Sequence, residues 1–211
     1  MSLDYLIPAA FPALILAHFV ALLSPGQDFF LISASAVRHG LAGSRFICLG
    51  VALGNGVYIA IAVLGWSGIR DSPQLFSIIE TLGAIYLLWM GLQLLRSQAG
   101  DFVTGDPAGH APTVRRQLIS GLNSALLNPK NALFYMSLMT VILGPDATLA
   151  QQIFCGLWMF ATVLCWDLLL ARAIGLQRVR KMLGQRIHLI ERGAGAVLAA
   201  FGIGLFLQSG R

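Results

Sequence analysis

The sequence is 211 residues long, 57% hydrophobic and only 11% charged, with a net charge of +5. Because a soluble globular domain carries about 25% charged residues, this composition excludes a soluble enzyme, a disordered chain and a nucleic-acid-binding protein. We therefore expect an all-α polytopic membrane protein, whose positive charge comes from cationic cytoplasmic loops.

Six apolar segments follow one another along the chain, at about residues 5–37, 45–68, 74–95, 118–143, 149–171 and 187–207. Each is long enough to cross a bilayer, which takes about 20 apolar residues. Residues 1–4 contain no Lys or Arg, so we expect the first segment to be retained rather than cleaved as a signal peptide. Residues 97–114 are rich in glycine and proline and predict a cytoplasmic linker between two halves, 1–96 and 115–211.

The basic residues alternate between the predicted loops. Loops one, three and five hold 11 of them, whereas the opposite side holds Arg70 and Arg211. This bias predicts six spans with the odd loops in the cytoplasm and both termini on the periplasmic side. The 11 residues are Arg38, Arg45, Arg96, Arg115, Arg116, Arg172, Arg178, Arg180, Lys181, Arg186 and Arg192.

The first and fourth segments are too long for one straight span. A continuous helix over 5–37 would measure about 50 Å, against a hydrocarbon core of about 30 Å. Pro25 lies within the first segment and Pro129 within the fourth. We expect both helices to be broken there, with the freed backbone groups facing protein or a cavity.

The two breaks resemble each other. Residues 21–33 and 125–137 match at six of thirteen positions with an offset of 104, and Gly40 and Gly144 align at the same offset. Three-span units repeated in this way enter the membrane from opposite sides, so we expect two inverted repeats whose broken helices meet near the midplane. Chance resemblance is the alternative, because three of the matches are Ala or Leu.

Each break has the residues of a new helix start. Ser24 and Asn128 are strong N-cap residues, and Pro25 and Pro129 then occupy the first helical position, where the missing N–H costs nothing. The positive end of each half-helix would therefore face the protein interior.

Charged and polar side chains sit beside these helix starts. Gln27 has capping-box spacing to the preceding serine, and Gly26 allows a close approach of the backbone. Asp28 and Lys130 are ionisable groups inside spans, which cost at least about 2.5–3.5 kcal/mol each on insertion scales. We interpret them as lining a substrate site; the structural alternatives are an Asp28–Lys130 salt bridge, or Asp28 bonding its own helix N-terminus.

An amino acid is a zwitterion that these groups would match. Its carboxylate suits a half-helix N-terminus or Lys130, and its ammonium suits Asp28, although other small polar solutes could use the same groups. The predicted substrate-binding residues are Ser24, Pro25, Gly26, Gln27, Asp28, Asn55, Asn128, Pro129, Lys130 and Asn131.

Other polar residues have two interpretations. Asn55 lies beside the small-residue motif Gly50–Gly54 and serves either close helix packing or a polar contact to the site. Asp167 is either an interfacial residue within reach of Arg172 or, like Asp28, a proton-coupling group. His18 is interpreted as an interior hydrogen-bonded histidine, with a proton relay as the alternative.

Motifs for other chemistry are missing from the sequence. No His, Cys and carboxylate cluster has metal-ligand spacing, and Cys48, Cys155 and Cys165 are expected to be packing residues. We find no phosphate-binding loop and no nucleophile with a matching base. We therefore expect no metal, no cofactor and no enzymatic activity.

Three runs of sequence resemble the lysine exporter (LysE) superfamily, most closely its homoserine/threonine-resistance (RhtB) branch. They are residues 23–29 with the glycines that follow, residues 83–91 and residues 128–134. Gln27 departs from the family pattern, which has a second proline there. The resemblance implies a bacterial inner-membrane amino-acid exporter driven by an ion gradient, and supports roles for Asp28, Asn128 and Lys130.

Together these features predict a secondary exporter of a small amino acid such as homoserine, threonine or leucine, coupled to protons. It would contact the substrate and membrane lipid and bind no nucleic acid, and the formation of homo-oligomers is left open. The alternatives are a transporter of another solute or cation, a lipid-linked substrate flippase, and a membrane enzyme or non-transporting scaffold subunit.

Overall fold

The computed structural model describes residues 6–24, 26–70, 72–96, 111–139, 143–144, 146–176, 178–179, 188–189, 192–193, 195–200, 202–204 and 206. These residues are helical or lie in turns between helices, as the all-α prediction requires. The elements are α1 (Phe11–Leu22), α2 (Gln27–Arg70), α3 (Pro73–Leu95), α4 (Val114–Leu126), α5 (Pro129–Ser137) and α6 (Leu149–Ile174). Residues 195–200 and 202–204 are also helical.

Both predicted helix breaks are present. α1 ends at Leu22 and α2 begins at Gln27, while α4 ends at Leu126 and α5 begins at Pro129. The first new helix thus begins two residues after the predicted position, and the Gly26 carbonyl accepts a hydrogen bond from the Phe30 amide.

The ends of α1 and α4 have the same backbone hydrogen bonds, displaced by 104 residues. The two amides beyond each helix donate back to carbonyls of its last turn. The bonds are Leu23 to Phe19 and Ser24 to Ala21 after α1, and Leu127 to Asn123 and Asn128 to Ala125 after α4. The similarity between the two breaks therefore extends from sequence to backbone geometry.

The predicted loop between the first two segments is instead a sharp kink within α2. Gly40, at φ 61° and ψ −158°, is the residue of α2 with non-helical backbone angles. Its carbonyl accepts from the Ser44 hydroxyl at 2.8 Å, and a side chain at this φ would be strained. Gly144 has φ 72°, and these two glycines, again 104 apart, are the positive-φ residues of the described chain. A single glycine thus takes the place of the predicted loop, and the residues that follow it are again helical.

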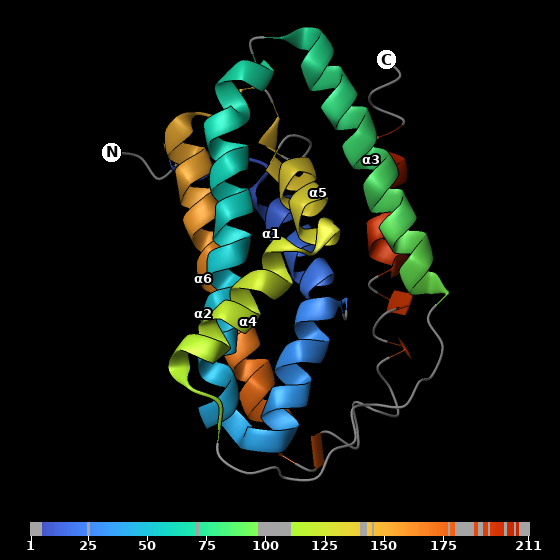
Figure 1. Cartoon of the computed structure of the whole chain (residues 1–211). Helices are drawn as coiled ribbons and strands as arrows, with labels where there is room; N and C mark the ends of the chain where they lie inside the picture. Colours follow the sequence, from blue (N-terminus) through green and yellow to red (C-terminus); the bar gives the residue numbers. More distant parts are fainter. Residues whose placement is uncertain are drawn as a thin grey trace.

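Beyond the kink, α2 lies alongside α4 and α6 (Figure 1). A Cβ added to Gly121 of α4 would contact the backbone of Ile47 and Val51, and one added to Gly54 would lie 2.6 Å from the Ala125 Cβ. The close packing predicted for Gly50 and Gly54 is therefore confirmed. On the other side of the molecule, Gly91 of α3 approaches the backbone of Ala199 in the same way.

Apolar side chains cover both the interior and the outer faces. Leu14, Ile32 and Met159 are fully buried where α1, α2 and α6 meet, whereas Leu64 and Leu157 are 79% and 65% exposed. Two stretches, Gln27–Gly65 and Leu149–Ile174, are long and apolar enough to cross a bilayer. Large exposed apolar side chains on such helices are typical of a surface that faces lipid.

We expect Gly121→Ala to destabilise the fold by about 1–3 kcal/mol, the usual cost of overpacking, because its methyl group would meet the backbone of α2. Thermal unfolding in detergent would measure the effect. Gly65→Ala is the matched control, since it is also helical and has nothing within 4 Å of the added Cβ. Equal melting temperatures for the two variants would contradict the role of Gly121.

Candidate functional site

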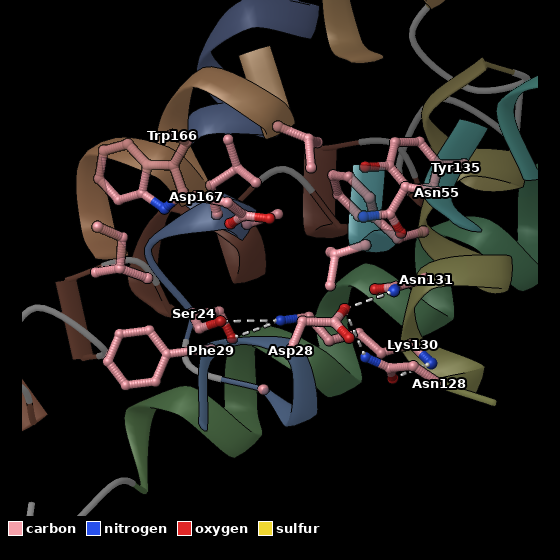
Figure 2. Close-up of a pocket in the computed structure, with 17 residues that line it drawn as sticks. Ser24, Asp28, Phe29, Asn55, Asn128, Lys130, Asn131, Tyr135, Trp166 and Asp167 are labelled. Carbon is pink, nitrogen blue, oxygen red and sulfur yellow. Dashed lines mark hydrogen bonds between the residues drawn. The ribbon is translucent and has the colours of Figure 1, made fainter. Parts of the chain in front are cut away.

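Side chains from both breaks line one cavity in the interior. Its volume is about 60 Å³, several times the roughly 10–15 Å³ that one water centre requires. α6 and the second part of α2 complete its walls (Figure 2). The polar lining residues are Ser24, Asp28, Asn55, Asn128, Lys130, Asn131, Tyr135, Trp166 and Asp167.

Asp28, in the first turn of α2, joins the first break to the second. Its carboxylate accepts from the Ser124 hydroxyl at 2.6 Å and from the Asn131 amide at 2.8 Å. The Asn128 amide lies at 3.4 Å from the same carboxylate. All three donors are neutral and come from α4, from α5 or from Asn128 in the short connection between them. The contacts thus stabilise the charge of Asp28 and also hold the two breaks together.

Lys130, in the first turn of α5, makes the reverse connection. Its ammonium donates to the Ser24 hydroxyl at 2.9 Å and to the Ser24 carbonyl at 3.1 Å. A Cβ on Gly26 would lie 3.6 Å from the same nitrogen, so the glycine leaves the ammonium room. Each break therefore supplies one charged side chain that binds the other break.

The two predicted caps have different roles. Asn128 caps α5 as expected, and its side-chain oxygen accepts from the Lys130 amide at 3.1 Å. Ser24 precedes α2 by three residues, and its hydroxyl accepts a hydrogen bond from the Lys130 ammonium. Asn128 thus acts within its own helix, whereas Ser24 acts across the site.

Asn55 of α2 and Asp167 of α6 lie across the cavity from the breaks (Figure 2). They are 5% and 7% exposed. Asn55 Oδ1 and Asp167 Oδ2 are buried and have no hydrogen-bond donor within the described part of the chain. The interpretation of Asp167 as an interfacial residue is therefore wrong. Buried acceptors are normally paired, so these two atoms mark where a donor-bearing ligand would fit.

Three predicted site residues, Pro25, Gln27 and Pro129, are not placed in the cavity wall. Gln27 is exposed and is not a lining residue, and Pro25 lies outside the described residues. Pro129 begins α5. Asn131 contacts Asp28 directly.

Sequence reasoning missed the apolar and aromatic residues that line the cavity, and one hydrogen-bond donor of the site. Phe134, Tyr135 and Trp166 line the cavity, and Ser124 binds Asp28. The serine precedes the second break by one helical turn, which is a usable signal, but the aromatic residues look like ordinary apolar residues of a span. His18 is fully buried, stacked 6.1 Å from Phe134 between ring centroids, and does not line the cavity.

The chemistry of the cavity suits a small solute with both a donor and an acceptor end. One wall offers the ammonium of Lys130, and the opposite wall offers the free oxygens of Asn55 and Asp167. Among the described residues, no group of three or more His, Cys, Asp or Glu side chains could hold a metal ion. Binding through polar and charged groups is therefore what the arrangement can do.

We expect Asn128→Ala to cost about 1 kcal/mol of stability through the lost cap. Asn128→Asp should cost more, although aspartate caps helices as well as asparagine, because its carboxylate would replace an amide 3.4 Å from Asp28. Thr113→Asp is the control, since Thr113 caps α4 at an exposed position followed by Arg115 and Arg116. Thermal unfolding of the three variants would test this order, and an Asn128→Asp variant as stable as the parent would contradict it.

The sequence is similar to those of known membrane transport proteins. A threonine efflux protein of Salmonella typhi is 31% identical over 201 residues, covering 92% of this chain and 95% of the relative. A threonine efflux protein of Escherichia coli K12 is 30% identical over 92% of this chain and 95% of its own length. A leucine efflux protein of Enterobacter sp. 638 is 30% identical over 64% of each chain. No solved structure was found to match the chain.

The LysE type translocator family matches residues 19–209, almost the whole length of the sequence. This confirms the resemblance that the three sequence runs indicated, and with it a membrane transport protein rather than an enzyme. The chain belongs to the LysE type translocator family.

Proposed function

We propose that this protein exports a small neutral amino acid, of the threonine, homoserine or leucine class, across a bacterial inner membrane. The observation that carries the proposal is the interior cavity, which places a lysine ammonium opposite unpaired carboxylate and amide oxygens. The relatives named threonine and leucine efflux proteins support the substrate class.

The zwitterion would bind with its carboxylate toward Lys130 and the N-terminus of α5, where the positive end of the helix dipole favours an anion. Its ammonium would lie toward Asn55 Oδ1 and Asp167 Oδ2, which have no donor of their own. Asp28 already accepts from three side chains. Its main role would therefore be to hold the site residues in place and to balance the positive charges of Lys130 and the substrate, rather than to bind the substrate ammonium by itself.

Six spans in two inverted repeats, 1–96 and 115–211 joined by the linker 97–114, are the architecture that we propose. The helix ends, the breaks and the two positive-φ glycines that recur at a spacing of 104 support it. Gln117 of α4 bonds the backbone of Phe46 and Ala42 in α2, which brings the basic residues of loops one and three to the same end. That end would face the cytoplasm, with both termini periplasmic, and the site would open alternately to each side.

Flux measurements with purified protein in liposomes would test the function. We expect labelled threonine to exchange in counterflow, and Asp28→Asn to abolish the exchange while the protein still inserts and folds, because an amide cannot accept from all three neighbouring donors. Asp146→Asn is the matched control, since Asp146 is exposed and away from the cavity.

The alternatives make different predictions in that assay. A transporter of another solute would exchange that solute and not amino acids, and an enzyme or scaffold subunit would move nothing when purified alone. Normal threonine counterflow by the Asp28→Asn variant would remove Asp28 from the mechanism.

Asp167 is the side chain that we propose to couple export to protons. Its unpaired oxygen can take either a proton or the substrate ammonium, and the charged and titratable groups that share the cavity are Asp28, Lys130 and Tyr135. We expect Asp167→Asn to keep counterflow at reduced affinity but to lose the acceleration of net transport by a pH gradient. Export by this variant that still responds to the gradient would exclude Asp167 as the coupling group.

A further inference from the structure

A second cavity lies between the first part of α2 and α4. Its volume is about 440 Å³. The walls carry Arg38, His39 and Ser35 from α2, and Arg116, Gln117 and Ser120 from α4. None of these residues lines the interior cavity described above, so this space, which we call the vestibule, is distinct from it.

Gln117 connects the two helices that form the vestibule. It is 3% exposed, and its side chain donates to the Ala42 and Pro112 carbonyls and accepts from the Phe46 amide. Its hydrogen-bonding groups are therefore used to connect α2 with α4. Arg38 and Arg116 are the charged residues that line the vestibule.

The electrostatics of the vestibule are one-sided. Arg38 and Arg116 are exposed, and neither has a carboxylate partner within the described ranges. His39 adds a ring nitrogen, Nδ1, that is buried and unpaired there. Two guanidinium groups that have no carboxylate partner in the described part of the chain can attract carboxylates and phosphates.

The vestibule lies about one helical turn from residues of the central site along both α2 and α4. Leu31 of α2 lies three residues, about one helical turn, after Asp28, and Ser120 of α4 lies four residues before Ser124. Leu31 and Ser120 line the vestibule, and Asp28 lines the interior cavity. The 2.6 Å hydrogen bond from Ser124 to Asp28 therefore lies about one helical turn from vestibule residues on both α2 and α4.

We propose that the vestibule is an access site that receives the carboxylate of the amino acid from the cytoplasmic side. Arg38 and Arg116 bind that carboxylate, and the Ser124–Asp28 contact closes the passage to the central cavity. The inference rests on the proposed function for the identity of the solute. Its charge selectivity follows from the vestibule residues alone.

Charge-selective labelling tests the vestibule without any need for transport. Ser120→Cys, in a Cys165→Ser background, places a thiol in the vestibule; Cys48 and Cys155 are buried. In inside-out vesicles, this thiol is labelled with the anionic sulfonatoethyl methanethiosulfonate and, separately, with its cationic trimethylammonium analogue. The ratio of the anion's labelling rate to the cation's should be higher for this thiol than for a free thiol in solution. Arg38→Gln and Arg116→Gln should each lower this anion-to-cation rate ratio by roughly three-fold, and high salt should do the same.

Arg45→Gln is the matched control. Arg45 is also exposed near this end of α2, but it stacks on Phe46 with its guanidinium carbon 4.8 Å from the ring centroid and is not a vestibule residue. It should leave the ratio almost unchanged. The proposal would be overturned if Arg38→Gln and Arg116→Gln left the rate ratio unchanged, or if Arg45→Gln lowered it by as much as they do.

A transport arm identifies the anion. With substrate supplied from the cytoplasmic side, the double arginine variant should raise KM for threonine several-fold with little change in kcat, and should leave KM for threonine amide unchanged. If the arginines instead hold a lipid headgroup, labelling will depend on anionic lipid in the vesicles and KM for threonine will not change, which overturns the proposal. If no amino acid is transported at all, the proposed function fails, and the labelling ratio still reports on the vestibule.

Discussion

The structure depends on how two interrupted helices satisfy their polar groups inside an apolar bundle. An ionisable side chain placed in a span costs at least about 2.5–3.5 kcal/mol, and both breaks carry one. Asp28 is held by donors from α4, from α5 and from the connection between them, and Lys130 by the hydroxyl and carbonyl of Ser24. Each half of the chain therefore stabilises the charge of the other half. Neither break would be satisfied in isolation, which ties the formation of the site to the assembly of the two halves.

Much of this arrangement is readable from sequence because it is local or periodic. The prolines indicate where helices must stop, the capping role of Asn128 follows from its neighbours, and the spacing of 104 brings the two breaks into correspondence. Gly50 and Gly54 predict a close helix contact because small residues four positions apart let two helix backbones approach each other. The kink at Gly40 was missed because a basic, glycine-containing stretch is typical of a loop, and one residue with left-handed φ was enough to turn the chain.

The errors share a physical cause. Hydropathy indicates that a residue lies in a span but not which way it faces, so Asp167 looked interfacial and proved to be buried against the cavity. Tyr135 and Trp166 were missed for the same reason. Ser24 has the local pattern of a cap, yet its side chain binds Lys130, which is 106 residues away. A partner at that separation is set by packing, and a single sequence contains no local signal for it.

The two breaks correspond in backbone but differ in side chains, and that difference gives the site its polarity. At matching positions the first break has Gly26 and Asp28, and the second has Lys130 and Ala132. Each charged residue thus corresponds to a small residue at the matching position of the other break. Two identical breaks would bring like charges together, which costs energy in a medium of low dielectric constant. An identical pair would also present the same group to both ends of a ligand. Complementary breaks avoid the repulsion, and they form a cavity with one cationic wall, so a solute with unlike ends can bind in a single orientation.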